Sequence, residues 1–499
     1  MDLDLYRRRA ESFCEQLSRE HYLHLAGHKR EFEIEPIYEH HGDLFAREAV
    51  EGLREALAAS GDGAGDGEAA RRLVYLLEFA VHGHLGIATA PQEARLAELE
   101  AELELDFGSE RLPYRAAPVA QANEPDASRR EAIAQARDAL LVEDLNPLHV
   151  EVLERTHELT RDLGWNSYRE MCAELHGFEL EPLAEQTREF LRATTAAYPG
   201  VLGPELERAG LEPLGGLRRS DLPRLFRAPA LDGQFPDERL VSSLDDTLSA
   251  IGIDLSGQDN VYLDTEPRPT KSPRAFCATP RVPEEVYLVV APVGGRDDYA
   301  ALFHEGGHTE HYANVDPGLE FEYRHLGDNS VTESFAFLLE GLTSTPAWLE
   351  ARLGIDDPAA VTAHVRAVRL LMLRRYAAKL DYEMSLHDAG VDLAAMPGRY
   401  ADLLGAATRV EWPRASWISD VDPAFYAACY LRAWALEAIW RSALTQRFGD
   451  DWFATPQAGE WLRGLWRSGQ RLRADELVAE TLGEQLDFGA LAAEFSAAG

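Results

Sequence analysis

Apolar residues recur every three or four positions along most of this chain, with charged residues between them. Residues 43–59 (DLFAREAVEGLREALAA) follow this pattern closely. The spacing places the apolar side chains on one face of a helix with 3.6 residues per turn. The same period predicts helices near residues 3–20, 68–86, 91–105, 128–143, 147–163, 182–198, 236–251, 297–313, 330–342, 358–388, 424–446 and 458–469. The sequence therefore predicts a mainly α fold.

Strand-like segments gather in one part of the chain. Residues 274–279 (RAFCAT) and 284–292 (EEVYLVVAP) are rich in β-branched or aromatic residues and are bounded by proline or glycine, and residues 261–264 could add a third short strand. A small sheet is therefore expected directly before the helix at 297–313. Segment 107–127 has three prolines and little periodicity, which predicts a loop.

The chain of 499 residues carries 86 Asp and Glu against 49 Lys and Arg, a formal net charge of −37. This charge repels phosphate groups, so nucleic acids and anionic membrane surfaces are not expected partners. The four cysteines lie far apart and form no CxxC pair, which favours a reducing compartment. The charged N-terminal segment has no apolar stretch behind it, and no unbroken apolar run approaches the ~18 residues of a membrane span. We therefore expect a cytoplasmic protein.

Residues 303–308 (FHEGGH) contain two histidines four positions apart. Histidines at i and i+4 lie on one helix face, so the imidazoles of His304 and His308 can bind one metal ion. Glu305 is rotated by about 100° from His304 around the helix and can reach a metal-bound water molecule without binding the metal. In this HExxH pattern zinc lowers the pKa of the water, and the carboxylate removes a proton as the water attacks a carbonyl. The alternative is a solvated polar helix face, which the apolar residues 301–303 beside the motif disfavour.

A catalytic zinc ion needs three protein ligands and one open position. Glu333, in the segment NSVTESF of residues 329–335, could supply the third ligand from a second helix. Two alternatives stay open at this point. Ser330 and Glu333 have the spacing of a capping box, in which the glutamate would bond to the helix N-terminus instead. Glu340, two turns further on, would lie on the same helix face and is a rival ligand.

These residues resemble a known family, the zinc metallopeptidases of the thimet oligopeptidase and oligoendopeptidase F type. The family signature, His-Glu-x-Gly-His-x-x-His, is matched at every fixed position by residues 304–311 (HEGGHTEH). The family has a glutamate ligand about 25 residues after the second histidine and a further glutamate one heptad later, and Glu333 and Glu340 match these positions. Residues 275–277 (AFC) and 163–168 (LGWNSY) are also similar to family segments.

The resemblance implies a single zinc ion held by His304, His308 and Glu333, with Glu305 as the general base. It also implies that His311, the last histidine of the signature, faces the substrate or supports a ligand. The sequence itself leaves open a second interpretation, in which His311 is packed in the core.

Family members also use C-terminal tyrosines, preceded by a histidine, to hydrogen-bond the oxyanion of the reaction. Tyr426 and Tyr430 match these tyrosines, and their spacing of four would place both hydroxyls on one helix face. The preceding histidine has no counterpart, because no histidine follows His387. The two tyrosines could instead pack in the core. Segment 284–292 would be an exposed edge strand, to which a peptide adds by main-chain pairing.

By the same resemblance, the fold would be a large multi-helix peptidase with a small sheet beside the motif helix and a deep substrate groove. Residues 1–175 would form a helical wall of this groove, and residues 176–499 the catalytic region. The two regions could instead form one interlocked unit. The expected activity is hydrolysis of short peptides by an oligopeptidase of the endopeptidase type. Two alternatives stay open. One is a zinc carboxypeptidase or dipeptidase, in which Arg409 or Arg414 holds the substrate terminus. The other is a peptide-binding relative that has lost catalysis.

Overall fold

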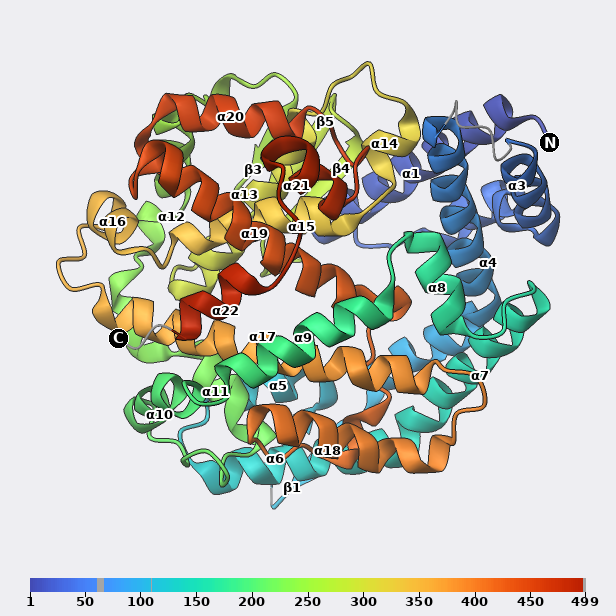
Figure 1. Ribbon diagram of the computed structural model, residues 1–499. Helices are drawn as coiled ribbons and strands as arrows, with labels where there is room; N and C mark the ends of the chain where they lie inside the picture. The colour runs from blue at the N-terminus through green and yellow to red at the C-terminus, as the bar shows by residue number, and fades with distance from the viewer. Residues whose placement is uncertain (61–66, 109, 497–499) are drawn as a thin grey trace. The chain divides into compact units, whose positions relative to one another are not determined.

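The computed structural model describes residues 1–60, 67–108 and 110–496 (Figure 1). Most of these residues are helical, which confirms the predicted mainly α fold. The strands in this described part of the chain form one two-stranded and one three-stranded sheet. Helices form where the sequence has its 3.6-residue apolar period, because that period gives each helix a face to bury.

The chain folds into two compact units, each built from three separate stretches. The first unit comprises Met1–His84, Ala230–Thr362 and Arg432–Ala490, and the second comprises Leu85–Pro229, Ala363–Leu431 and Leu491–Gly499. A single division near residue 175, as expected from the sequence, therefore does not separate the two units. The long helices α4 (Gly67–Glu102), α17 (Ala359–Leu386) and α19 (Tyr426–Phe448) each contribute residues to both units.

The first unit contains the motif helix and its neighbours. Its further helices are α1 (Leu3–Leu25), α2 (Glu35–His41), α3 (Arg47–Ala59), α12 (Asp237–Ala250), α13 (Arg296–Ala313), α14 (Phe321–His325), α15 (Asn329–Leu342), α16 (Pro346–Trp348), α20 (Pro456–Trp466) and α21 (Ala474–Leu482). The predicted helices near 297–313 and 330–342 correspond to α13 and α15 and are confirmed. Figure 1 shows both helices in yellow.

The sheet of the first unit consists of β3 (Val261–Asp264), β4 (Phe276–Arg281) and β5 (Glu285–Val289), in the order β3-β5-β4. β5 runs parallel to β3 and antiparallel to β4. The three predicted strands are confirmed, but the prediction that segment 284–292 forms an exposed edge is wrong. β5 is the central strand, and its side chains Val286 and Leu288 are fully buried. The edges of this sheet are β3 and β4.

In the described part of the second unit, helices are accompanied by one pair of antiparallel strands. Its further helices are α5 (Ala117–Asn123), α6 (Ala127–Leu140), α7 (Asn146–Asp162), α8 (Tyr168–His176), α9 (Leu180–Thr194), α10 (Tyr198–Arg208), α11 (Leu222–Arg227) and α18 (Met396–Thr408). Helix α22 (Gly489–Ser496) begins at its border with the first unit.

Segment 107–127, predicted to be a loop, is largely ordered structure. Strand β1 (Glu104–Phe107) pairs with β2 (Glu110–Pro113), and α5 follows. Leu105 and Tyr114 are buried in an apolar cluster of this unit, which stabilises the segment. The prolines do not prevent this structure, because Pro113 ends a strand and Pro118 lies in the first turn of α5. Proline is tolerated at both kinds of position.

Among the described residues, helix α4 alone is long and apolar enough to cross a membrane, judged by length and composition. The sequence contains no unbroken apolar run of that length. Averaged over an 18-residue window, however, the hydropathy of α4 reaches the level of a membrane-spanning helix. In this structure 44% of that stretch is buried. A helix in a protein core can have the same length and composition, so this feature is weak evidence for a membrane span.

Candidate metal centre

Helix α13 carries the HExxH motif, and the chain before it determines where the helix begins. Gly294 and Gly295 both have a positive φ, of 85° and 88°, which is strained for residues with a Cβ. The Asp298 carboxylate accepts hydrogen bonds from the N–H groups of Val293 and Gly294 at 2.9 and 3.0 Å. The helix therefore begins at Arg296, shortly after the sheet and close to the predicted position.

Two glycines within the motif have different neighbours. A Cβ on Gly307 would lie 2.5 Å from the Phe335 carbonyl oxygen and 2.6 Å from the Ala336 Cα, both in the backbone of α15. A Cβ on Gly306 would meet only the end of the Leu244 side chain, at 3.2 Å. Helix α13 packs more extensively against α15 than against any other element. Gly307 permits this close approach, which brings the side chains of α15 to the motif.

Asp328 caps α15, so the capping-box alternative for Glu333 is wrong. The Asp328 carboxylate accepts hydrogen bonds from the N–H groups of Ser330 and Ala474, at 2.9 and 3.0 Å. It also forms an ion pair with Arg432 at 2.9 Å. Burial acts to raise the pKa of Asp328, but the Arg432 charge and these hydrogen bonds lower it to about 2. Glu333, more than one turn into the helix, faces α13 instead.

His304, His308 and Glu333 converge as the sequence predicted. Glu333 Oε2 lies 3.4 Å from His304 Nε2 and 3.7 Å from His308 Nε2. One atom from each of the three side chains lies within 4.8 Å of the other two. Two ligand atoms that are each about 2.0–2.1 Å from a tetrahedral zinc ion lie about 3.4 Å apart. The three residues therefore fit a zinc ion.

The second nitrogen of each imidazole is hydrogen-bonded to a residue of α15. His304 Nδ1 bonds with Glu340 Oε2, and His308 Nδ1 bonds with Thr332 Oγ1, both at 2.9 Å. When Nδ1 carries the hydrogen, Nε2 presents its lone pair toward Glu333. Glu340 therefore orients His304 and does not join the three converging residues as a rival ligand.

The histidines differ in charge when no metal is bound. Burial acts to lower the pKa of His304, but its hydrogen bonds with Glu333 and Glu340 raise it to about 10. Burial lowers the pKa of His308 to about 4. His304 thus carries a proton between two carboxylates, and a bound cation would replace that positive charge.

The carboxylate of Glu305 is held by the sheet. Its Oε2 accepts a hydrogen bond from the Cys277 backbone N–H of β4 at 2.9 Å. Burial raises the pKa of Glu305. Burial also raises the pKa of the Cys277 thiol, which disfavours the reactive thiolate form. The motif did not predict contacts with the Cys277 backbone N–H or the Thr332 hydroxyl, and the similarity of residues 275–277 to a family segment was the one available signal.

His311 lies in the core. Its side chain is fully buried, with ring centroids 5.2 Å from Tyr312 and 5.1 Å from Phe335. Burial lowers its pKa to about 3. The expected substrate-facing role does not agree with this position. The other interpretation from the sequence, a packed histidine, describes it. Seven residues are nearly two full turns, so His311 lies on the same helix face as His304 but about 10 Å further along the axis, where it packs against Phe335 of α15.

Tyr426 and Tyr430 belong to the second unit, at the start of α19. Their rings meet edge to face with centroids 4.9 Å apart, and the Tyr430 ring also meets Tyr376 at 5.6 Å. The predicted i, i+4 arrangement is thus present, while a role of these tyrosines at the metal centre stays a prediction. Arg409 and Arg414 are exposed residues of the same unit, as surface charges would be.

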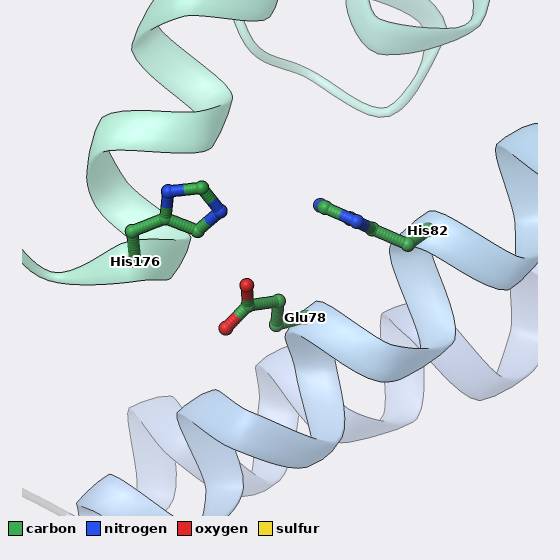
Figure 2. A group of neighbouring side chains, drawn as sticks. All are labelled: Glu78, His82 and His176. Atoms are coloured by element: carbon green, nitrogen blue, oxygen red, sulfur yellow. The ribbon is translucent and has the colours of Figure 1, made fainter. Parts of the chain in front are cut away.

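A second group of histidine and carboxylate side chains involves helix α4. Figure 2 shows Glu78 and His82 one turn apart on this helix, both in the first unit. His176, the third residue drawn, ends α8 in the second unit. Since the three residues are divided between the two units, we assign no metal centre to them.

Comparison with protein-family models and with curated proteins finds no match to this chain. The family resemblance therefore depends on the motif residues of the sequence alone.

Proposed function

We propose that this protein is a cytoplasmic zinc metallopeptidase that hydrolyses short peptides. One observation carries the proposal: Glu333 Oε2 lies 3.4 and 3.7 Å from the Nε2 atoms of His304 and His308. These separations are close to the distance between two ligand atoms of a tetrahedral zinc ion, about 3.4 Å. Two imidazoles and one carboxylate favour zinc over harder cations such as Mg²⁺, which prefer oxygen ligands. Three protein ligands also leave one position open, as in catalytic zinc sites.

The residues around the ligands have suitable roles for peptide hydrolysis. A bound zinc ion supplies Lewis acidity, polarising a carbonyl and lowering the pKa of water. Glu305 acts as the general base, taking a proton at its carboxylate and passing it to the leaving amine. The Cys277 N–H keeps this carboxylate in one direction, and burial raises the pKa of Glu305, which favours proton uptake. The family resemblance alone implies that Tyr426 or Tyr430 hydrogen-bonds the oxyanion.

The resemblance to the thimet oligopeptidase and oligoendopeptidase F type supports the same activity. Residues 304–311 match each fixed position of that signature, and Glu333 and Glu340 stand at the expected distances. By this resemblance the substrates are short peptides cut internally, which enter a deep groove that excludes folded proteins.

The test combines metal analysis with peptide cleavage. The purified full-length protein should contain about one zinc ion per chain. It should cleave short fluorescence-quenched peptides, lose this activity on chelation, and regain it when zinc is added back. Mass spectra of the products would distinguish internal cuts from removal of terminal residues. A protein that binds zinc but cleaves no peptide would contradict the proposed activity. A protein that takes up no zinc would contradict the proposed centre.

A further inference from the structure

Two aromatic rings lie beside the candidate metal centre without belonging to it. Phe337 of α15 meets the ligand His304 edge to face, with centroids 5.2 Å apart. Trp434 of α19 stacks on Phe337, with centroids 5.0 Å apart and planes inclined by 23°. All three residues belong to the first unit. The rings therefore form a continuous aromatic surface that begins at a metal ligand.

The exposure of α15 suggests that this surface is more than core packing. Every side chain from Ser330 to Ala336 is buried, whereas Phe337 and Glu340 are partly exposed. Phe337 follows Glu333 by four residues and precedes Glu340 by three, so the three side chains share one stripe of the helix. A large apolar ring thus stands on the stripe that carries the metal ligand.

Trp434 follows the same pattern on α19. Residues 431–433 and 435–440 are all buried, and Trp434 is the one partly exposed position among them. The His304 side chain, at the other end of this aromatic surface, is also partly exposed (19%). Water therefore reaches both the metal ligand and the rings. Apolar ring surface exposed next to a metal centre gains free energy when an apolar group covers it.

We infer that Phe337 and Trp434 form a recognition surface for an aromatic or large aliphatic side chain of the substrate, next to the bond that is cut. This inference rests on the proposed peptidase function. The rings are neutral, and the nearest carboxylate on the stripe, Glu340, is already hydrogen-bonded to His304 Nδ1. An apolar side chain therefore suits this surface better than a charged one.

The experiment uses three quenched peptides that differ only beside the scissile bond, with Phe, Ala or Arg at that position. Wild-type protein should cleave the Phe peptide with the highest kcat/KM. Phe337→Leu and Trp434→Ala should lower the ratio of kcat/KM for Phe over Ala by about tenfold, within the range for discrimination by apolar contacts. Tyr262→Leu is the control, because Tyr262 is an exposed aromatic residue of β3, two strands away from β4.

Two further measurements separate recognition from support of His304. Zinc affinity and thermal stability of Phe337→Leu should stay close to wild type. Binding of the Phe peptide to the Glu305→Gln protein, measured by calorimetry, should weaken about tenfold when Trp434→Ala is added.

An unchanged Phe-to-Ala ratio, a preference for Arg, or an equal loss on all peptides with weaker zinc binding would each overturn the inference. If wild type cleaves all three peptides equally, the recognition surface fails while the peptidase function stands. If it neither binds nor cleaves any of them, both fail.

Discussion

Glu305 follows the ligand His304 directly in the motif, and its carboxylate is hydrogen-bonded to the Cys277 N–H and is not one of the three converging side chains. Glu305→Gln keeps a side chain of the same shape that can still contact the Cys277 N–H. We expect zinc content to be unchanged and kcat to fall by about 10²–10⁴-fold, since an amide cannot accept the proton. Metal analysis and peptide cleavage on the same preparation check this. Wild-type turnover by this variant would remove Glu305 from the proposed role.

A second prediction at this scale concerns the ion pair between Asp328 and Arg432, whose side chains are 3% and 7% exposed. The folded pKa of Asp328 is about 2, below its ordinary 3.8. A carboxyl group whose pKa is lower in the folded than in the unfolded protein stabilises the folded state above about pH 4. This contribution disappears as the pH falls from about 4 to 2. Asp328→Asn should therefore lower the free energy of unfolding by about 2–4 kcal/mol at pH 7. The difference from wild type should shrink as the pH approaches 2.

The control for this prediction is Asp126→Asn. Asp126 caps α6 by accepting hydrogen bonds from Ser128 and Arg129, but its side chain is exposed. Asparagine is also a good N-cap, so this change should cost less than about 1 kcal/mol. Urea unfolding at several pH values measures both variants. Equal effects of the two substitutions would mean that the buried charge of Asp328 contributes nothing beyond capping.

At the scale of the element, the approach of α15 to α13 determines whether the metal centre can form. Gly307→Ala would put a Cβ 2.5 Å from the Phe335 carbonyl oxygen, and this backbone cannot move away without shifting α15. We expect a loss of about 1–3 kcal/mol in stability and zinc binding at least tenfold weaker, because Glu333 moves with its helix. Denaturant unfolding and competition with a chromophoric chelator measure the two effects.

Gly306→Ala is the matched control on the same helix. Its Cβ would meet only the tip of the Leu244 side chain, which can rotate, and alanine favours helix by about 1 kcal/mol over glycine. Stability and zinc affinity should therefore stay close to wild type. If both alanine variants bind zinc equally well, the close helix contact at Gly307 does not control the site.

The sequence predicted the elements better than their arrangement. Helices α13 and α15 and strands β3, β4 and β5 follow from local periodicity, whereas β1, β2 and α5 occupy a segment predicted to be a loop. His304 and His308 follow from their spacing on one helix. Spacing alone left Glu333 and Glu340 open as the third ligand, and the family resemblance favoured Glu333. The order β3-β5-β4 does not, because pairing between distant strands decides which of them is central. The burial of His311 likewise depends on how closely α15 packs against α13. Local sequence contains no measure of that distance.

The division of the chain into two units could not be predicted from the sequence either. Each unit draws on three stretches of chain, so no change in composition along the sequence marks a border. The motif residues His304, His308 and Glu333 nevertheless all fall in the first unit. The candidate centre is thus built by one compact unit, while the tyrosines expected to assist it belong to the other.

The net charge of −37 should make the stability of this protein depend on salt concentration. Like charges repel one another in the compact state, and salt screens this repulsion over distances beyond about 8 Å at 0.15 M. Salt also weakens the attraction within exposed ion pairs, which reduces the stability gained by screening the repulsion. Such pairs are worth little each, as expected for Arg111 and Asp106, which are 70% and 68% exposed. Repulsion should therefore dominate, and the Tm should rise by roughly 2–5 °C between about 0.02 and 0.5 M NaCl. Near pH 5, where histidines and some carboxylates gain protons, the rise should be smaller. A Tm that falls with salt at neutral pH would mean that the ion pairs outweigh the net charge.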